Sequence, residues 1–183
     1  MRRAAPIGWL LVAPLVASAQ QSPGPSVREM VLQARQLAGQ KEHREAAAVL
    51  ERAIEIAPNS EEVLRDYAHN SLAVKDPVGA MGALEPLTRM HPDKSEYPYL
   101  MGVAQLQVAG VGLAVESLQT SLTLDPNRVL TLIALGFAYN AQKKFDEAKA
   151  TLARSLVLEP EEVEALAAMA EALEGLGEIE QAE

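Results

Sequence analysis

The stretch Val129–Glu162, VLTLIALGFAYNAQKKFDEAKATLARSLVLEPEE, decides the fold of this chain. Small residues and large apolar residues recur in it three or four positions apart, as on one face of a helix, and a proline lies near its end. That proline belongs to a series, because Pro58, Pro92, Pro126 and Pro160 each lie 34 residues from the next. A constant period of this length indicates one structural unit repeated along the chain.

The spacing inside the stretch identifies the unit. Seven residues share it: Leu132, Leu135, Gly136, Tyr139, Ala148, Leu152 and Pro160. This order, large-x2-Leu-Gly-x2-Tyr, then Ala-x3-large and Pro, resembles the helix–turn–helix unit of the tetratricopeptide repeat family. The resemblance implies an all-α fold, a right-handed α-solenoid of about four and a half 34-residue repeats. The repeats are Val27–Ser60, Glu61–Lys94, Ser95–Arg128, Val129–Glu162 and a partial Val163–Glu183.

The composition agrees with a helical protein. Apolar residues make up 49% of the 183 residues and aromatic residues only 4%, and alanine and leucine favour helices over strands. The chain has no cysteine, which excludes a disulfide framework and a thiolate metal site.

Local signals place several helix ends. Ser26 and Glu29 have the spacing of a capping box, and Asp76-Pro77 is a favourable helix start. The helix that follows Asp76 contains Gly79, Gly82 and Pro86. We therefore expect its repeat to be the least stable of the repeats, with a kink in the helix at the proline. In the family that the chain resembles, small residues at position 8 of each repeat allow the helices to cross closely. They are Ala34, Ala68, Gly102, Gly136 and Ala170.

The first 26 residues differ from the repeats. Residues 1–19 have a short positive start, an apolar run and a small-x-small site before Gln20, which is typical of a secretory signal peptide. The alternative is an ordinary apolar helix. The run is short for a membrane span, so we expect an exported protein, periplasmic or secreted and bacterial, with no stable membrane insertion after cleavage. Residues 20–26 are polar and rich in proline, as in a flexible linker.

Charge is distributed unevenly along the chain. The formal net charge is −9, and residues 159–183 contain nine acidic residues and no basic one. The basic surface expected of a nucleic-acid-binding protein is missing, so we expect no nucleic acid among the partners.

The residues that carry chemistry in enzymes do not form a recognisable set. His43, His69 and His91 lack metal-ligand spacing. Asp66 and His69 share a helix face but have no nucleophile at a meaningful distance in sequence. Gly110-Val111-Gly112 is interpreted as a turn between helices, not a phosphate loop. We therefore predict no enzymatic activity, no cofactor and no metal.

The resemblance also implies a binding surface. In tetratricopeptide repeats the first helix of each unit lines a concave groove through positions 2, 5, 9, 12 and 13. The basic N-terminal candidates are Arg28, Arg35, Arg65 and His69. The candidates in the middle are Tyr99, Val103, Leu106, Ile133, Phe137 and Asn140, with Leu130 at their edge. Acidic residues follow at Glu164, Glu171 and Glu174, so the groove is predicted to run from basic to apolar to acidic. The alternative is that Ile133 and Phe137 only pack against the next helix.

Two functions are compatible with these features. The first is an exported, non-catalytic scaffold that binds a protein or peptide in the concave groove, in cell-envelope assembly. The second is an N-terminal accessory repeat domain of a longer enzyme or envelope protein whose active part lies beyond Glu183. The sequence does not identify the partner or an oligomeric state.

Overall fold

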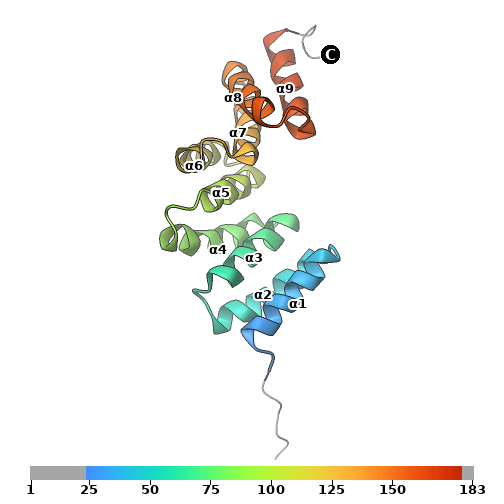
Figure 1. Cartoon of the computed structure of the whole chain (residues 1–183), viewed down its shortest axis with the longest axis vertical. Coiled ribbons are helices and arrows are strands. Elements are labelled where there is room, and N and C mark those ends of the chain that lie inside the picture. The colour runs from blue at the N-terminus through green and yellow to red at the C-terminus, as the bar shows by residue number, and fades with distance from the viewer. Residues whose placement is uncertain (1–23, 179–183) are drawn as a thin grey trace, which may run out of the picture.

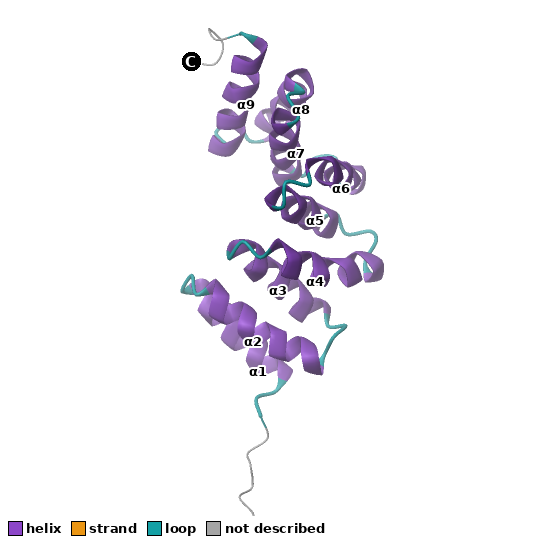
Figure 2. Ribbon diagram, turned by 180° about the vertical axis from the view of Figure 1, so that it is seen from behind, coloured by secondary structure: helices purple, strands orange, loops and turns teal. Residues whose placement is uncertain are grey.

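The protein is an elongated stack of helices (Figures 1 and 2). The structure is a computed structural model that describes residues 24–178. Within that range the chain forms nine helices and no strand, which confirms the predicted all-α helical repeat fold. They are α1 Val27–Gly39, α2 His43–Ile56, α3 Glu61–Ala73, α4 Pro77–Met90, α5 Glu96–Gln107, α6 Val111–Leu124, α7 Val129–Ala141, α8 Phe145–Leu158 and α9 Val163–Leu176. The signal peptide and most of the predicted linker lie outside the described residues.

The order of the helices in space follows their order in sequence. Each helix packs against the next, and the first helices of successive repeats (α1, α3, α5, α7 and α9) also contact one another. Among the described residues, no such contact joins the second helices, α2, α4, α6 and α8. Because only the first helices approach each other, the stack curves toward them. We call the surface that they form the first-helix face.

Every repeat makes the same turn between its two helices. The turn residue at position 15 has a positive φ in all five repeats. These residues are Lys41, Lys75, Ala109, Lys143 and Gly177, with φ between 57° and 76°. The following residue donates its N–H to a carbonyl five positions earlier, as in the bond from Glu178 N to Leu173 O. This is the Schellman arrangement, which satisfies helix-end carbonyls. Gly177 therefore completes the turn of the fifth repeat.

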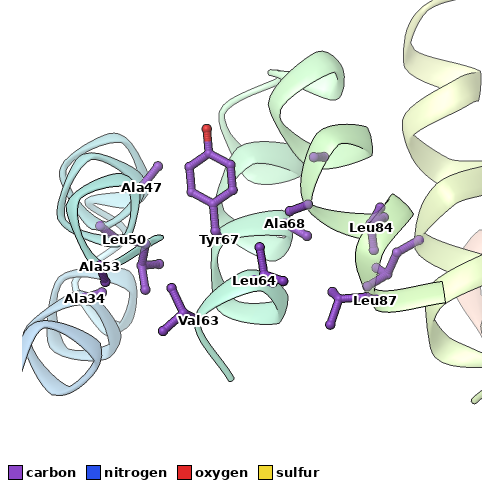
Figure 3. Close-up of a cluster of buried hydrophobic side chains, with 14 of the residues drawn as sticks. Ala34, Ala47, Leu50, Ala53, Val63, Leu64, Tyr67, Ala68, Leu84 and Leu87 are labelled. Carbon is purple, nitrogen blue, oxygen red and sulfur yellow. The ribbon is translucent and has the colours of Figure 1, made fainter. Parts of the chain in front are cut away.

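The clusters of buried side chains cross the boundaries between repeats. Figure 3 shows α3 between its two neighbours, with Val63 toward α2 and the leucines of α4 on its other side. Leu84 and Leu87 are fully buried. The predicted close crossing at position 8 is present, because a Cβ on Gly102 would lie 2.6 Å from Leu118 Cγ. Real Cβ atoms do not approach so closely, so a larger residue at this position would force Leu118 to move.

The predicted helix starts are present at α1 and α4. Ser26 Oγ accepts the N–H of Glu29, and the Glu29 carboxylate accepts the N–H of Ser26, which is a complete capping box. Asp76 accepts the N–H of Gly79, with Pro77 in the first turn.

The structure bears on two local predictions, one in α4 and one at the turn before α6. The helix α4 runs unbroken from Pro77 to Met90 although Pro86 removes one backbone donor from its interior. The predicted turn Gly110-Val111-Gly112 lies two residues too late, because the turn covers residues 108–110 and α6 begins at Val111. The positive φ at Ala109, where a glycine is favoured, hid this boundary in the sequence.

Candidate functional site: the first-helix face

The predicted basic end of the groove is neutralised by acidic residues. Arg35 forms ion pairs with Glu62 at 2.9 Å and with Asp66 at 2.6 Å, and the bond to Asp66 raises the pKa of the guanidinium. Arg65 also contacts Asp66, at 3.3 Å. The two Arg35 pairs link α1 to α3 and so hold neighbouring repeats together, whereas the Arg65 pair lies within α3. Their charges largely cancel at this end of the surface.

The remaining two basic candidates differ. His69 Nε2 lies 3.1 Å from the Glu96 carboxylate of the next repeat. Asp66 faces the arginines instead, so the two do not form a dyad. Arg28 is exposed and has no ion pair within the described part of the chain. It borders a hollow of about 500 Å³ with Leu32, whose side chain is 58% exposed and which sequence reasoning missed.

Half-buried side chains form the middle of the first-helix face. Tyr99, Val103 and Leu106 of α5 are all of intermediate exposure. The Arg128 guanidinium lies over the Tyr99 ring, 4.9 Å from its centroid. Burial raises the pKa of the Tyr99 hydroxyl, and the Arg128 charge opposes this shift. Arg128 is outside the family's groove positions, so only the folded structure reveals this contact.

The candidates on α7 separate into two pairs. Ile133 is 3% exposed and packs with Ala165, Ala168 and other α9 residues in a core cluster. Asn140 is 4% exposed, and its Nδ2 donates to Ala168 O at 2.8 Å. Both residues therefore lie in the interface between repeats. Ile133 therefore packs against the next helix, which is the alternative to a groove position. Phe137, about one helical turn further along α7, is 38% exposed.

Phe137 and Leu130 form the open apolar surface of α7. Leu130 is 50% exposed and lies seven residues before Phe137, on the same side of the helix. Seven of the 13 residues of α7 are buried, among them Leu132 and Leu135. These two exposed side chains thus face solvent on a helix that is otherwise mostly core.

The acidic end of the face is exposed. Glu164, Glu171 and Glu174 of α9 are all exposed, and they take part in no ion pair between residues 24 and 178. Asn140 Nδ2 also donates to the Glu171 carboxylate at 3.2 Å. The three carboxylates lie on one side of α9 and give this end a net negative charge.

A second hollow, of about 280 Å³, lies between α2, α3 and α4. Ile54, Leu64 and Ala83 line it, and the absence of side chains at Gly79 and Gly82 opens it. The Tyr67 hydroxyl at its edge donates to Glu51 at 3.0 Å. In sequence the two glycines indicate only a weak helix, and the hollow that they open is visible only in the folded structure.

Side-chain clusters of other kinds add no second site. No group of three or more histidine, aspartate or glutamate residues that could hold a metal ion occurs among residues 24–178. None of the helices in that range is long and apolar enough to cross a membrane.

Comparison with known proteins agrees with the repeat architecture. A family model described as tetratricopeptide repeat matches residues 37–104. No curated protein sequence matches the chain significantly.

Solved structures similar to this chain include MamA, with a TM-score of 0.74, 18% identity and 85% of each chain covered. The protein TTC0263 of Thermus thermophilus has a TM-score of 0.71 and 20% identity, with 86% of each chain covered. YrrB, described as a protein of this repeat class with an unusual peptide-binding site, has a TM-score of 0.66 and 17% identity, with 86% of this chain and 87% of YrrB covered. At these identities the likeness shows the fold alone. Together with the family match over residues 37–104 and the 34-residue unit, it supports the assignment of this chain to the tetratricopeptide repeat family.

Proposed function

We propose that the protein is a non-catalytic scaffold that binds a segment of another protein, or a peptide, on the first-helix face. The observation that carries the proposal is the exposure of Leu130 and Phe137 on α7. Both project from a rigid helix whose other apolar side chains are mostly buried. Clustered apolar side chains of this kind provide the anchor of a peptide interface, while charges around them fix orientation. The peptide-binding site named for YrrB supports this use of the fold.

The proposal extends to the location of the protein. The positive start, apolar run and small-x-small site of residues 1–19 support export, to the periplasm or out of the cell. A role in assembling the cell envelope fits an exported scaffold. The N-terminus of the protein recovered from the envelope fraction is expected near Gln20, and mass spectrometry measures it. An intact Met1 on that protein would refute the export proposal.

A matched pair of variants tests the binding surface. Phe137→Asp places a charge on the first-helix face, and Val157→Asp places the same charge on α8, at a side chain that is 82% exposed. Both variants are expected to keep the helical circular dichroism of the parent. Partner proteins that copurify from an envelope extract with the parent should be lost only with Phe137→Asp. Equal capture by all three proteins would show that binding does not use this face.

A further inference from the structure

Among residues 24–178, α9 is the one first helix that is not packed against a second helix of its own repeat. In the four complete repeats the second helix packs along the first, and the residue at position 4 of the first helix is buried. These residues are Met30, Leu64, Pro98 and Leu132. Leu166 has the same position in α9 and is 48% exposed. The difference follows from the repeat architecture, in which each helix is buried only by its neighbours.

The uncovered side of α9 is an apolar strip formed by Val163, Leu166 and Ala170, which we call the α9 open face. These residues are spaced three and four positions apart, so they lie on one side of the helix. Val163 is 73% exposed, and Ala170 is half-buried although position 8 is buried in each complete repeat. Glu164 and Glu171 of the first-helix face hold positions 2 and 9, on a different side of α9. The two surfaces are therefore distinct.

The complete repeats show what kind of helix covers such a strip. Each second helix presents an alanine at position 20, a leucine at position 24 and an alanine, serine or leucine at position 27, all of them 0% exposed. They are Ala46, Leu50 and Ala53; Ala80, Leu84 and Leu87; Ala114, Leu118 and Ser121; and Ala148, Leu152 and Ser155. The leucine lies against position 8 of the first helix, as Leu118 lies against Gly102. A helix seated in the same way on α9 would place its leucine over Ala170.

Charge selects among the possible occupants. Residues 159–183 contain nine acidic residues and no basic one, so a second copy would bring like charge to this end of the molecule. The second helices of this chain have the required pattern, but each is already packed in its own repeat. Helices joined by such short turns are antiparallel, so a helix in this place begins near the C-terminal end of α9. The exposed carboxylate of Glu174 lies there and favours a basic first turn.

We propose that the α9 open face binds an amphipathic helix of another protein, which completes the fifth repeat in trans. The bound helix places a leucine over Ala170, with an alanine four positions before the leucine and a small residue three positions after it. Its first turn carries lysine or arginine. This is recognition of a helix by an apolar groove, in which spaced apolar anchors provide affinity and flanking charges provide selectivity. The surface is separate from the first-helix face, and the inference does not depend on the function proposed for that face.

The test uses fluorescein-labelled peptides with the sequence of α8, residues 145–158, whose binding to the full chain is followed by fluorescence anisotropy. The first peptide carries Asp146→Lys and Glu147→Lys in its first turn, and a matched peptide carries Leu152→Asp in addition. A third peptide keeps both acidic residues. We expect the first peptide to bind, the third to bind about threefold more weakly and the Leu152→Asp peptide to bind at least about tenfold more weakly.

A matched pair of protein variants locates the peptide. Leu166→Asp should weaken binding of the first peptide at least about tenfold, because it places a charge in the apolar strip. Leu113→Asp is the control, since Leu113 lies on α6 and is 59% exposed, and it should bind the peptide like the parent. Circular dichroism checks that both variants keep their helices. The Leu152→Asp peptide keeps the test decisive if Leu166→Asp reduces the helix content.

Several results would overturn the proposal. Equal affinities for the Leu166→Asp and Leu113→Asp variants would show that the peptide does not use the α9 open face. Binding that is lost with Phe137→Asp and kept with Leu166→Asp would place the peptide on the first-helix face. Failure of all three peptides to bind would mean that another part of this chain or a second copy covers the strip. Analytical ultracentrifugation identifies the second copy as a dimer that Leu166→Asp dissociates.

Discussion

Gly136 of α7 lies directly against Leu152 of α8, so that a Cβ at residue 136 would stand 2.5 Å from Leu152 Cγ. The two residues occupy positions 8 and 24 of the fourth repeat. Gly102 and Leu118 have the same relationship in the third. The contact sets how closely the two helices of a repeat approach, because a methyl group would have to displace a fully buried leucine.

The first prediction concerns this contact. Gly136→Ala should lower the free energy of unfolding by about 1–3 kcal/mol, because overpacking at Leu152 outweighs the better helix propensity of alanine. Gly82→Ala is the control, since a Cβ there meets nothing within 4 Å in the middle of α4. It should raise the free energy of unfolding by about 0.5–1 kcal/mol. Urea denaturation followed by circular dichroism measures both. A Gly136 variant as stable as the parent would contradict the proposed packing.

The second prediction separates core from surface on α7. Ile133→Ala should lower the free energy of unfolding by about 2–4 kcal/mol, since it opens a cavity against α9. Phe137→Ala should lower it less, by about 1–2 kcal/mol, because the residue is 38% exposed. Thermal and urea unfolding of the two variants provide the comparison. The reverse order would place Phe137 in the core and remove the apolar anchor from the binding surface.

The third prediction follows from the ion cluster at Glu61. Its carboxylate accepts bonds from Lys94 and Tyr97 and lies 2.9 Å from His91 Nε2. These contacts, led by Lys94, lower the pKa of Glu61 from 4.5 to about 2. A carboxyl whose pKa is lower in the folded state stabilises the protein above its unfolded pKa. That contribution should be lost as pH falls from about 4.5 toward about 2.

Urea unfolding at a series of pH values tests this window. Glu61→Gln should reduce stability at neutral pH and flatten the decline of stability between pH 4.5 and 2. Glu116→Gln, which alters an exposed carboxylate that has no ion pair among the described residues, should preserve the pH dependence of the parent. Parallel curves for the parent and Glu61→Gln would show that Glu61 does not hold its low pKa in solution.

The fourth prediction concerns the start of the solenoid. Ser26→Ala removes the oxygen that accepts the Glu29 N–H and should lower the free energy of unfolding by about 1 kcal/mol. Ser26→Gly should cost only a few tenths of a kcal/mol, since glycine is also accepted at the N-cap. Amide hydrogen exchange in α1 should increase in the alanine variant. Identical exchange in both variants would argue against the capping box as the cause.

The repeat pattern predicted the helices because each repeat buries its side chains mainly against its sequence neighbours. Close crossings, the capping box at Ser26 and the start of α4 at Asp76 were all predictable from local spacing. The turn around Ala109 was predicted two residues too late, since an alanine does not indicate a positive φ. The family's groove positions did not distinguish the buried Ile133 from the exposed Phe137, although both are large and apolar.

The sequence by itself determined the all-α repeat architecture, the length of its unit and the small residues at its crossings, because these depend on short-range periodicity. Tertiary structure decided which charges remain available. It paired Arg35 with Glu62 and Asp66, and it fixed the Asn140 amide against Ala168 and Glu171. Such pairings join residues about 30 positions apart, and their strength depends on distances that only the stacking of repeats sets. The sequence predicts a groove that runs from basic to apolar to acidic. Because ion pairs occupy Arg35 and Arg65, the folded protein presents chiefly an apolar and an acidic surface to a partner.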